Sequence, residues 1–202
     1  MVYYRIDPEL FGEKYAYATP YADCQNYDHN VKEAYCPLCG RAVGCSVWMG
    51  PYRLYVSSMK IPDVMYGVGF PMLISDRFKT AYESSTLRGV DSFQKYELFY
   101  RGKPIETDFF CPRIAYSVKK IEFAKAQNQN RIYDKSLPKC SLCRKSGNGR
   151  QDDGTRFYFD DIPEYDIFRI YEEPGKIYCS QKFLLFCQQS QFKNIVEYMR
   201  EI

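Results

Sequence analysis

The chain has 202 residues, and 46% of them are hydrophobic, which is enough for a buried core and excludes a mainly disordered protein. Its formal net charge of +3 is small for this length and argues against a dedicated nucleic-acid-binding protein, which is usually strongly basic. The 20 tyrosines, against a single tryptophan, favour strands, so we expect a sheet-rich protein with much amphipathic surface.

The sequence shows neither an export signal nor a membrane-spanning segment. Its first residues, Met1–Ile6, lack a basic segment followed by an apolar one, and no apolar run approaches about 20 residues. We therefore expect a cytoplasmic protein. The nine cysteines are odd in number and include two Cys-x-x-Cys pairs, a spacing that is typical of metal ligands. Reduced thiols are the expectation.

Residues 1–35 are expected to form an N-terminal flap. Strand-like alternation at Val2–Ile6 is followed by loop signals at Pro8 and Pro20. The first Cys pair then begins the segment that we expect to be the first repeat, residues 36–118.

The first repeat is predicted to contain a strand, a capped helix and a closing strand. Aromatic alternation predicts the first strand at Tyr52–Val56. Ser75 is a good helix N-cap, and Asp76 favours the first helical turn. Gly89 is expected to end the helix, because glycine tolerates left-handed backbone, and the closing strand follows at Phe93–Tyr100. The helix face that we expect to be buried consists of Phe78, Ala81, Tyr82 and Ser85.

Residues 119–139 are rich in Lys, Gln and Asn and are expected to form a linker. The second repeat, residues 140–202, shows the same order of signals. Ser180 is its helix N-cap, and Asn194, which also tolerates left-handed backbone, takes the place of the glycine. The closing strand is expected at Val196–Ile202, and the two repeats are expected to form one compact body. The equivalent helix face consists of Phe183, Phe186, Cys187 and Ser190.

These landmarks predict an internal duplication. The Cys pair at Cys36 recurs 104 residues later at Cys140, and Ser75-Asp-Arg-Phe recurs 105 residues later as Ser180-Gln-Lys-Phe. A common register is expected of a repeated unit. The alternative is a chance match between two ordinary amphipathic helices. Weaker matches link Ile61-Pro62-Asp63 with Ile162-Pro163-Glu164, and Tyr52–Val56 with Arg156–Phe159.

The two Cys-x-x-Cys pairs predict one structural zinc (Zn2+) site. Four thiolates in tetrahedral reach hold zinc, and the short spacing lets both sulfurs of a turn face the ion. The expected ligands are Cys36, Cys39, Cys140 and Cys143. Lengthening the loop between the pairs from about 15 to about 100 residues costs only about 1.7 kcal/mol of loop-closure entropy. A structural zinc contributes roughly 10 kcal/mol. Metal-free thiols packed in a core are the alternative.

The second pair lacks one feature of the first. Arg144 follows it, where Gly40 follows the first pair, and positive φ at an arginine costs on the order of 1 kcal/mol. Cys45 and His29 flank the first pair and are candidate substitute ligands. His29 is the only histidine, which removes most Ser-His and Cys-His constellations, and no catalytic group is evident. The cysteines expected to be small buried hydrophobes are Cys24, Cys45, Cys111, Cys179 and Cys187.

A family resemblance rests on Cys36-Pro-Leu-Cys39-Gly40, on the second pair that begins at Cys140, and on the segment from Ile74 to Val90. On these motifs the chain, from about Cys36 onward, resembles the double-CXXCG family of bacterial proteins. Members are regarded as immunity proteins that protect a cell from a sibling's polymorphic or contact-delivered toxin. The resemblance therefore implies a cognate toxin as the partner. The chain departs from the family pattern at Arg144, where the pattern has Gly.

We thus predict an α+β protein of two homologous halves, each with a Cys-x-x-Cys turn, short antiparallel strands and a capped helix, joined around a shared zinc site. Its expected function is to bind and neutralise a toxin without catalysis. Two alternatives stay open: a zinc-ribbon nucleic-acid-binding protein, and a thiol redox enzyme that uses one Cys pair. The basic residues available to the first alternative are Lys119, Lys120, Lys139, Arg144 and Lys145.

Overall fold

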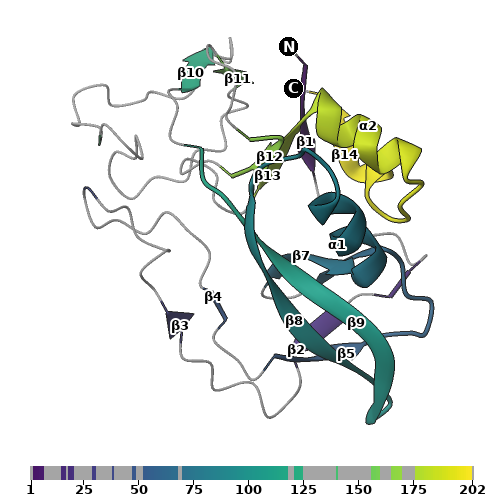
Figure 1. Cartoon of the computed structure of the whole chain (residues 1–202). Helices are drawn as coiled ribbons and strands as arrows, with labels where there is room; N and C mark the ends of the chain where they lie inside the picture. Colours follow the sequence, from purple (N-terminus) through teal and green to yellow (C-terminus); the bar gives the residue numbers. More distant parts are fainter. Residues whose placement is uncertain are drawn as a thin grey trace, which may run out of the picture.

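The computed structural model shows an α+β protein in which strands predominate over two α-helices (Figure 1). The predicted α+β class and the predicted abundance of strands are therefore confirmed. The residues that the structure describes are 2–6, 15–16, 18–20, 29–30, 38, 47–48, 52–67, 70–117, 121–124, 140, 156–159, 165–169 and 176–201.

Six strands curl into a barrel in the order β2-β5-β8-β9-β7-β6. A single parallel pair, Ala18 with Gly67, joins the first and last of these strands and closes the barrel. The strands are β2 (Ala18–Pro20), β5 (Arg53–Val56), β6 (Val64–Gly67), β7 (Phe70–Ser75), β8 (Val90–Tyr100) and β9 (Lys103–Ile114). The strand predicted at Tyr52–Val56 and the closing strand predicted at Phe93–Tyr100 are both present.

The strands β8 and β9 form a long hairpin. They pair antiparallel from Val90 with Ile114 to Tyr100 with Lys103, and a two-residue turn connects them. The turn residues Arg101 and Gly102 have φ angles of 49° and 77°. Positive φ at both central residues gives a turn whose twist matches that of the flanking strands, so the turn favours this register.

Four short strands form a second, antiparallel sheet in the order β12-β13-β1-β14. They are β12 (Ile167–Phe168), β13 (Ile177–Ser180), β1 (Tyr3–Ile6) and β14 (Met199–Glu201), with the short 3-10 helix η4 (Val196–Tyr198) before β14. Two further pairs of strands are β3 (His29–Asn30) with β4 (Val47–Trp48), and β10 (Ile121–Ala124) with β11 (Arg156–Phe159).

Both predicted helices are present, each with its predicted serine cap. The Ser75 side chain accepts a hydrogen bond from the backbone N–H of Phe78, and the Ser180 side chain accepts one from that of Phe183. The helices are α1 (Asp76–Glu83) and α2 (Gln181–Gln189). They lie side by side (Figure 1), with the Phe78 and Phe183 ring centroids 6.3 Å apart.

The helix ends differ from the prediction. The helix α1 ends at Glu83, well before Gly89, and α2 ends at Gln189, before Asn194. In α1 the next serine side chains bond to helical carbonyls: Ser84 Oγ donates to Thr80 O, and Ser85 Oγ to Tyr82 O. Serine hydroxyls compete in this way with the continuing backbone ladder. Gly89 and Asn194 do have positive φ, 119° and 71°, but in the loops beyond the helices.

One hydrophobic core joins the two helices to both sheets. It contains Ile74 and Phe78 next to Ile177 and Phe183, all at most 2% exposed. A second cluster fills the barrel and includes Leu54, Leu73 and Phe109. The strands β6 and β7 serve both clusters, because alternate side chains point to opposite faces of a strand. The members of the shared core from these two strands are Val64, Tyr66, Met72 and Ile74, whereas Met65 and Leu73 point into the barrel.

The first strand of the chain lies inside the second sheet. Within the predicted flap at 1–35, the alternation at Val2–Ile6 does form a strand, and β1 pairs with β13 on one side and with β14 on the other. Ile6 is fully buried in the shared core. The predicted boundaries of the repeats and of the linker stay predictions.

We predict that Gly89→Ala strongly destabilises the fold. A Cβ at this position would lie 1.8 Å from the carbonyl oxygen of Ile167, and a φ of +119° strains any side chain. We expect the free energy of unfolding to fall by about 3 kcal/mol or more in urea denaturation.

Gly102→Ala is the matched control for this substitution. Its φ is +77°, but no atom lies within 4 Å of the added Cβ, so only backbone strain of about 1–2 kcal/mol is expected. Equal losses of stability in the two variants would contradict the importance that we assign to the contact between Gly89 and Ile167.

Candidate metal centre and the carboxylate clasps

The predicted zinc ligands fall largely outside the described residues. Cys140 is described and half-buried, whereas Cys36, Cys39 and Cys143 lie outside the described part of the chain. Within that part, no group of three or more His, Cys, Asp and Glu side chains is arranged to hold a metal ion. The four-cysteine site therefore stays a prediction.

The two candidate substitute ligands are equally untested. His29 belongs to β3, where its backbone pairs with that of Trp48 in the neighbouring strand. Cys45 lies outside the described residues. Backbone pairing does not place an imidazole, so His29 stays a hypothesis as a ligand.

Two of the remaining cysteines are core residues, as predicted. Cys179 and Cys187 are fully buried in the shared core, and Cys111 is half-buried on β9. Burial raises the pKa of all three thiols, that of Cys111 to about 11 despite the opposing charge of Arg169. A protonated thiol is a poor nucleophile and a poor metal ligand. These three cysteines are therefore unsuited to redox catalysis in the folded protein.

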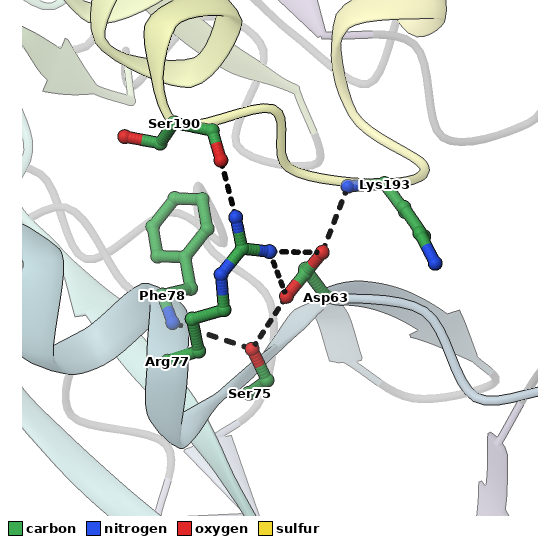
Figure 2. A network of polar contacts seen from close by, with 6 residues as sticks. All are labelled: Asp63, Ser75, Arg77, Phe78, Ser190 and Lys193. Atoms are coloured by element: carbon green, nitrogen blue, oxygen red, sulfur yellow. Dashed lines mark hydrogen bonds and ion pairs between the residues drawn. The ribbon is translucent and has the colours of Figure 1, made fainter.

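A buried carboxylate precedes the first helix and contacts several donors at once. The Asp63 side chain accepts hydrogen bonds from Ser75 Oγ at 3.2 Å and from Arg77 Nη1 at 3.0 Å. Its other oxygen accepts one from the backbone N–H of Lys193 at 2.9 Å, and its backbone carbonyl accepts one from the Ser75 N–H at 2.8 Å. Figure 2 shows the Asp63 carboxylate between Ser75, Arg77 and Lys193. We call this set of contacts the first clasp.

Arg77 extends the first clasp to the loop after the other helix. Its guanidinium donates to the backbone carbonyl of Ser190 and lies over the Phe192 ring, 4.9 Å from the ring centroid. The backbone N–H of Val64 also donates to the Lys193 carbonyl, at 3.2 Å. The start of α1 and the loop that follows α2 are thereby held together (Figure 2).

A second clasp has the same arrangement at the other helix. The Asp166 side chain accepts from Ser180 Oγ at 3.0 Å and from the backbone N–H of Arg88 at 3.0 Å. Its backbone carbonyl accepts from the Ser180 N–H at 2.9 Å. Lys182 takes the place of Arg77: its Nζ lies 3.7 Å from the Asp166 carboxylate and donates to Thr86 O at 3.2 Å.

The two clasps are reciprocal. Each carboxylate binds the cap serine of its own helix and a backbone N–H in the loop beyond the other helix. In each loop, the residue after the N–H donor has positive φ. It contacts the strand that follows the carboxylate to which that donor binds. Asn194 Nδ2 donates to Val64 O at 2.8 Å, and Gly89 lies against Ile167 O. The buried carboxylate of Asp63 and the half-buried one of Asp166 thus tie the two helix units to each other.

The structural counterpart of Asp63 is Asp166, two residues beyond the Glu164 that the sequence match indicated. Asp63 lies 12 residues before its cap serine, and Asp166 lies 14 residues before its own. The different lengths of these connections shift the register, so the fixed offset that aligns the cap serines cannot align the two acids. The signal that the sequence offers for both acids is an Asp directly before a strand that leads into each helix unit.

The clasp carboxylates are occupied by structural donors rather than available for chemistry. In the described part of the chain, each one accepts hydrogen bonds from a serine hydroxyl and from a backbone amide, which fixes its orientation. A general acid or base needs an oxygen that can reach a substrate proton. The arrangement supports a role in folding, and we assign it no catalytic one.

No model of a known protein family matches the sequence, and no curated protein matches it. Among the described residues, no helix is both long and apolar enough to cross a membrane.

We predict that Asp63→Asn weakens the fold although it preserves the shape of the side chain. An amide cannot accept from Ser75, Arg77 and the Lys193 N–H together, so one buried donor loses its partner. We expect the free energy of unfolding to fall by about 2–3 kcal/mol, measured by urea denaturation.

The control is Asp108→Asn. Asp108 forms a half-exposed ion pair with Lys95 at 2.7 Å on the hairpin, and exposed pairs contribute less than about 1 kcal/mol. A loss at Asp63 no larger than that at Asp108 would show that the first clasp does not hold the helices together.

Proposed function

We propose that this chain is a bacterial immunity protein, which binds and neutralises a cognate toxin and catalyses no reaction itself. In this proposal it consists of two homologous halves that share one structural zinc ion, held by Cys36, Cys39, Cys140 and Cys143. The observation that carries the proposal is the reciprocal pair of clasps. A duplicated unit with one Cys pair in each copy is the pattern on which the resemblance to the double-CXXCG family rests.

Four matched positions support the homology of the halves. Each unit has an acid directly before a strand, a cap serine, a basic residue two positions after the serine, and a residue with positive φ after the helix. The matched pairs are Asp63 with Asp166, Ser75 with Ser180, Arg77 with Lys182, and Gly89 with Asn194. Equivalent contacts made across the helix pair favour a duplication over chance similarity of two amphipathic helices.

The position of the Cys pairs also fits a duplication. The strand β5 begins 14 residues after Cys39, and β11 begins 13 residues after Cys143. These strands lie in the two matching aromatic segments of the sequence, Tyr52–Val56 and Arg156–Phe159. The Cys pairs therefore precede these strands by similar distances in the sequence, which supports a zinc site shared by the halves.

The tip of the long hairpin has the character of a protein-binding surface. The backbone N–H of Arg101 donates to the Tyr55 hydroxyl at 3.0 Å, and the Arg101 guanidinium lies 5.1 Å from the centroid of the Tyr100 ring. Tyrosine and arginine held in place in this way are the residues that most often dominate binding between proteins. They support a function in association rather than in catalysis.

The function is tested by a toxicity rescue experiment. We expect coexpression of this chain to restore the growth of cells that express the toxin encoded by the neighbouring gene, because the proposed complex blocks that toxin. A toxin from an unrelated locus is the control and should remain lethal. Continued killing by the neighbouring toxin, with the chain present in soluble form, would contradict the proposal.

The metal is tested separately. We expect one zinc ion per purified chain by elemental analysis, and we expect a chelator to lower the melting temperature, since a structural zinc contributes to folding. Cys140→Ser should lose the zinc. Cys111→Ser, which changes a half-buried cysteine outside the proposed site, should retain it. Zinc-free protein, or zinc retained by Cys140→Ser, would exclude the four-cysteine site.

A further inference from the structure

The strand β1 completes the second sheet. It lies between β13 and β14 and pairs antiparallel with both, so that Ile6 has Ile177 on one side and Met199 on the other. In the barrel, β9 occupies the corresponding place between β7 and β8. The order β6-β7-β9-β8 in the barrel thus corresponds to β12-β13-β1-β14 in the second sheet.

The two corresponding strands are attached in different ways. The strand β9 has 12 residues and follows β8 after the two-residue turn at Arg101 and Gly102. The strand β1 has four residues and comes from the opposite end of the sequence (Figure 1). Short ladders open at a lower free energy than the global unfolding of a protein. The second sheet therefore depends on a strand that no tight turn links to either neighbour and that forms only short runs of backbone pairing.

The buried side chains of β1 are Tyr3 and Ile6. Ile6 is fully buried in the core between the helices, and Tyr3, 5% exposed, packs edge to face on Phe168 with ring centroids 6.2 Å apart. Next to the anchored strand lies Cys179 of β13, which pairs with Tyr4 and is fully buried. Departure of β1 uncovers an edge of both β13 and β14 and leaves this thiol close to solvent.

We propose that β1 is a latch: it inserts as a separate strand into the groove between β13 and β14, and this groove opens by release of β1 while the barrel stays folded. The proposal does not depend on the identity of a toxin or on the presence of zinc.

Native-state hydrogen exchange and thiol labelling of the full chain test the latch. In the unmodified protein, we expect the amides of Ile177–Ser180 to exchange through an opening that depends less on urea than the exchange of β8 and β9 does. Labelling of Cys179 with iodoacetamide, followed by mass spectrometry of its peptide, should report the same opening. A single urea dependence for all of these segments would overturn the proposal.

A pair of equivalent substitutions sharpens this test. Ile6→Ala should raise the labelling rate of Cys179 by about tenfold or more while the exchange of β8 and β9 stays unchanged. Ile114→Ala removes the same atoms from the same core, but in β9, and should act on both sheets together. If Ile6→Ala accelerates exchange in β8 and β9 as much as in β13, β1 is an ordinary part of the global fold.

A rearranged chain provides an independent test. Tyr3–Ile6 is removed from the front and attached after Ile202 through an Asn-Gly turn, which imitates the turn between β8 and β9. We expect this chain to fold and to label Cys179 about tenfold more slowly than the natural chain, because the turn now holds the strand in place. Failure to fold, or unchanged labelling, would contradict the latch. The same chain with Ile6→Asp should not close the groove, and protection of Cys179 in it would equally overturn the proposal.

Discussion

A buried carboxylate that serves two helices at once is the constraint on which the rest of this structure depends. Asp63 receives donors from its own cap serine and from the loop beyond α2, and Asp166 does the same for the loop beyond α1. Neither helix can shift without leaving one of these carboxylates short of a donor, and for the buried Asp63 this loss costs more than the bond itself contributes. The loops are therefore fixed, and Gly89 and Asn194 are held against the strands opposite them.

Local features of the fold could be predicted from the sequence, because short-range chemistry decides them. Both serine caps and the buried faces of both helices follow from side chains within one or two turns. The predicted helix ends were wrong. A glycine indicates where the backbone takes positive φ, and that position lies in a loop beyond the end of the helix. In α1 the serine hydroxyls at Ser84 and Ser85 end the helix first.

Features that depend on distant pairing could not be predicted in this way. The alternation at Val2–Ile6 indicates a strand, but it does not indicate that this strand pairs with β13 and β14. The sequence match pairs Asp63 with Glu164, whereas the hydrogen bonds pair it with Asp166, because the connections before the two cap serines differ in length. Of the four predicted zinc ligands, only Cys140 lies in the described part of the chain, so the metal site rests on spacing alone.

The interleaving of the first and last strands also bears on biosynthesis. A ribosome makes β1 before its neighbours: β13 follows roughly 170 residues later and β14 roughly 190, which at about 5–20 residues per second is a delay of roughly 10–40 s. During that time the growing polypeptide can complete the barrel hairpin but not the second sheet. An apolar tetrapeptide would be an aggregation hazard over this interval, and Arg5 gives the waiting segment a charge that opposes premature association.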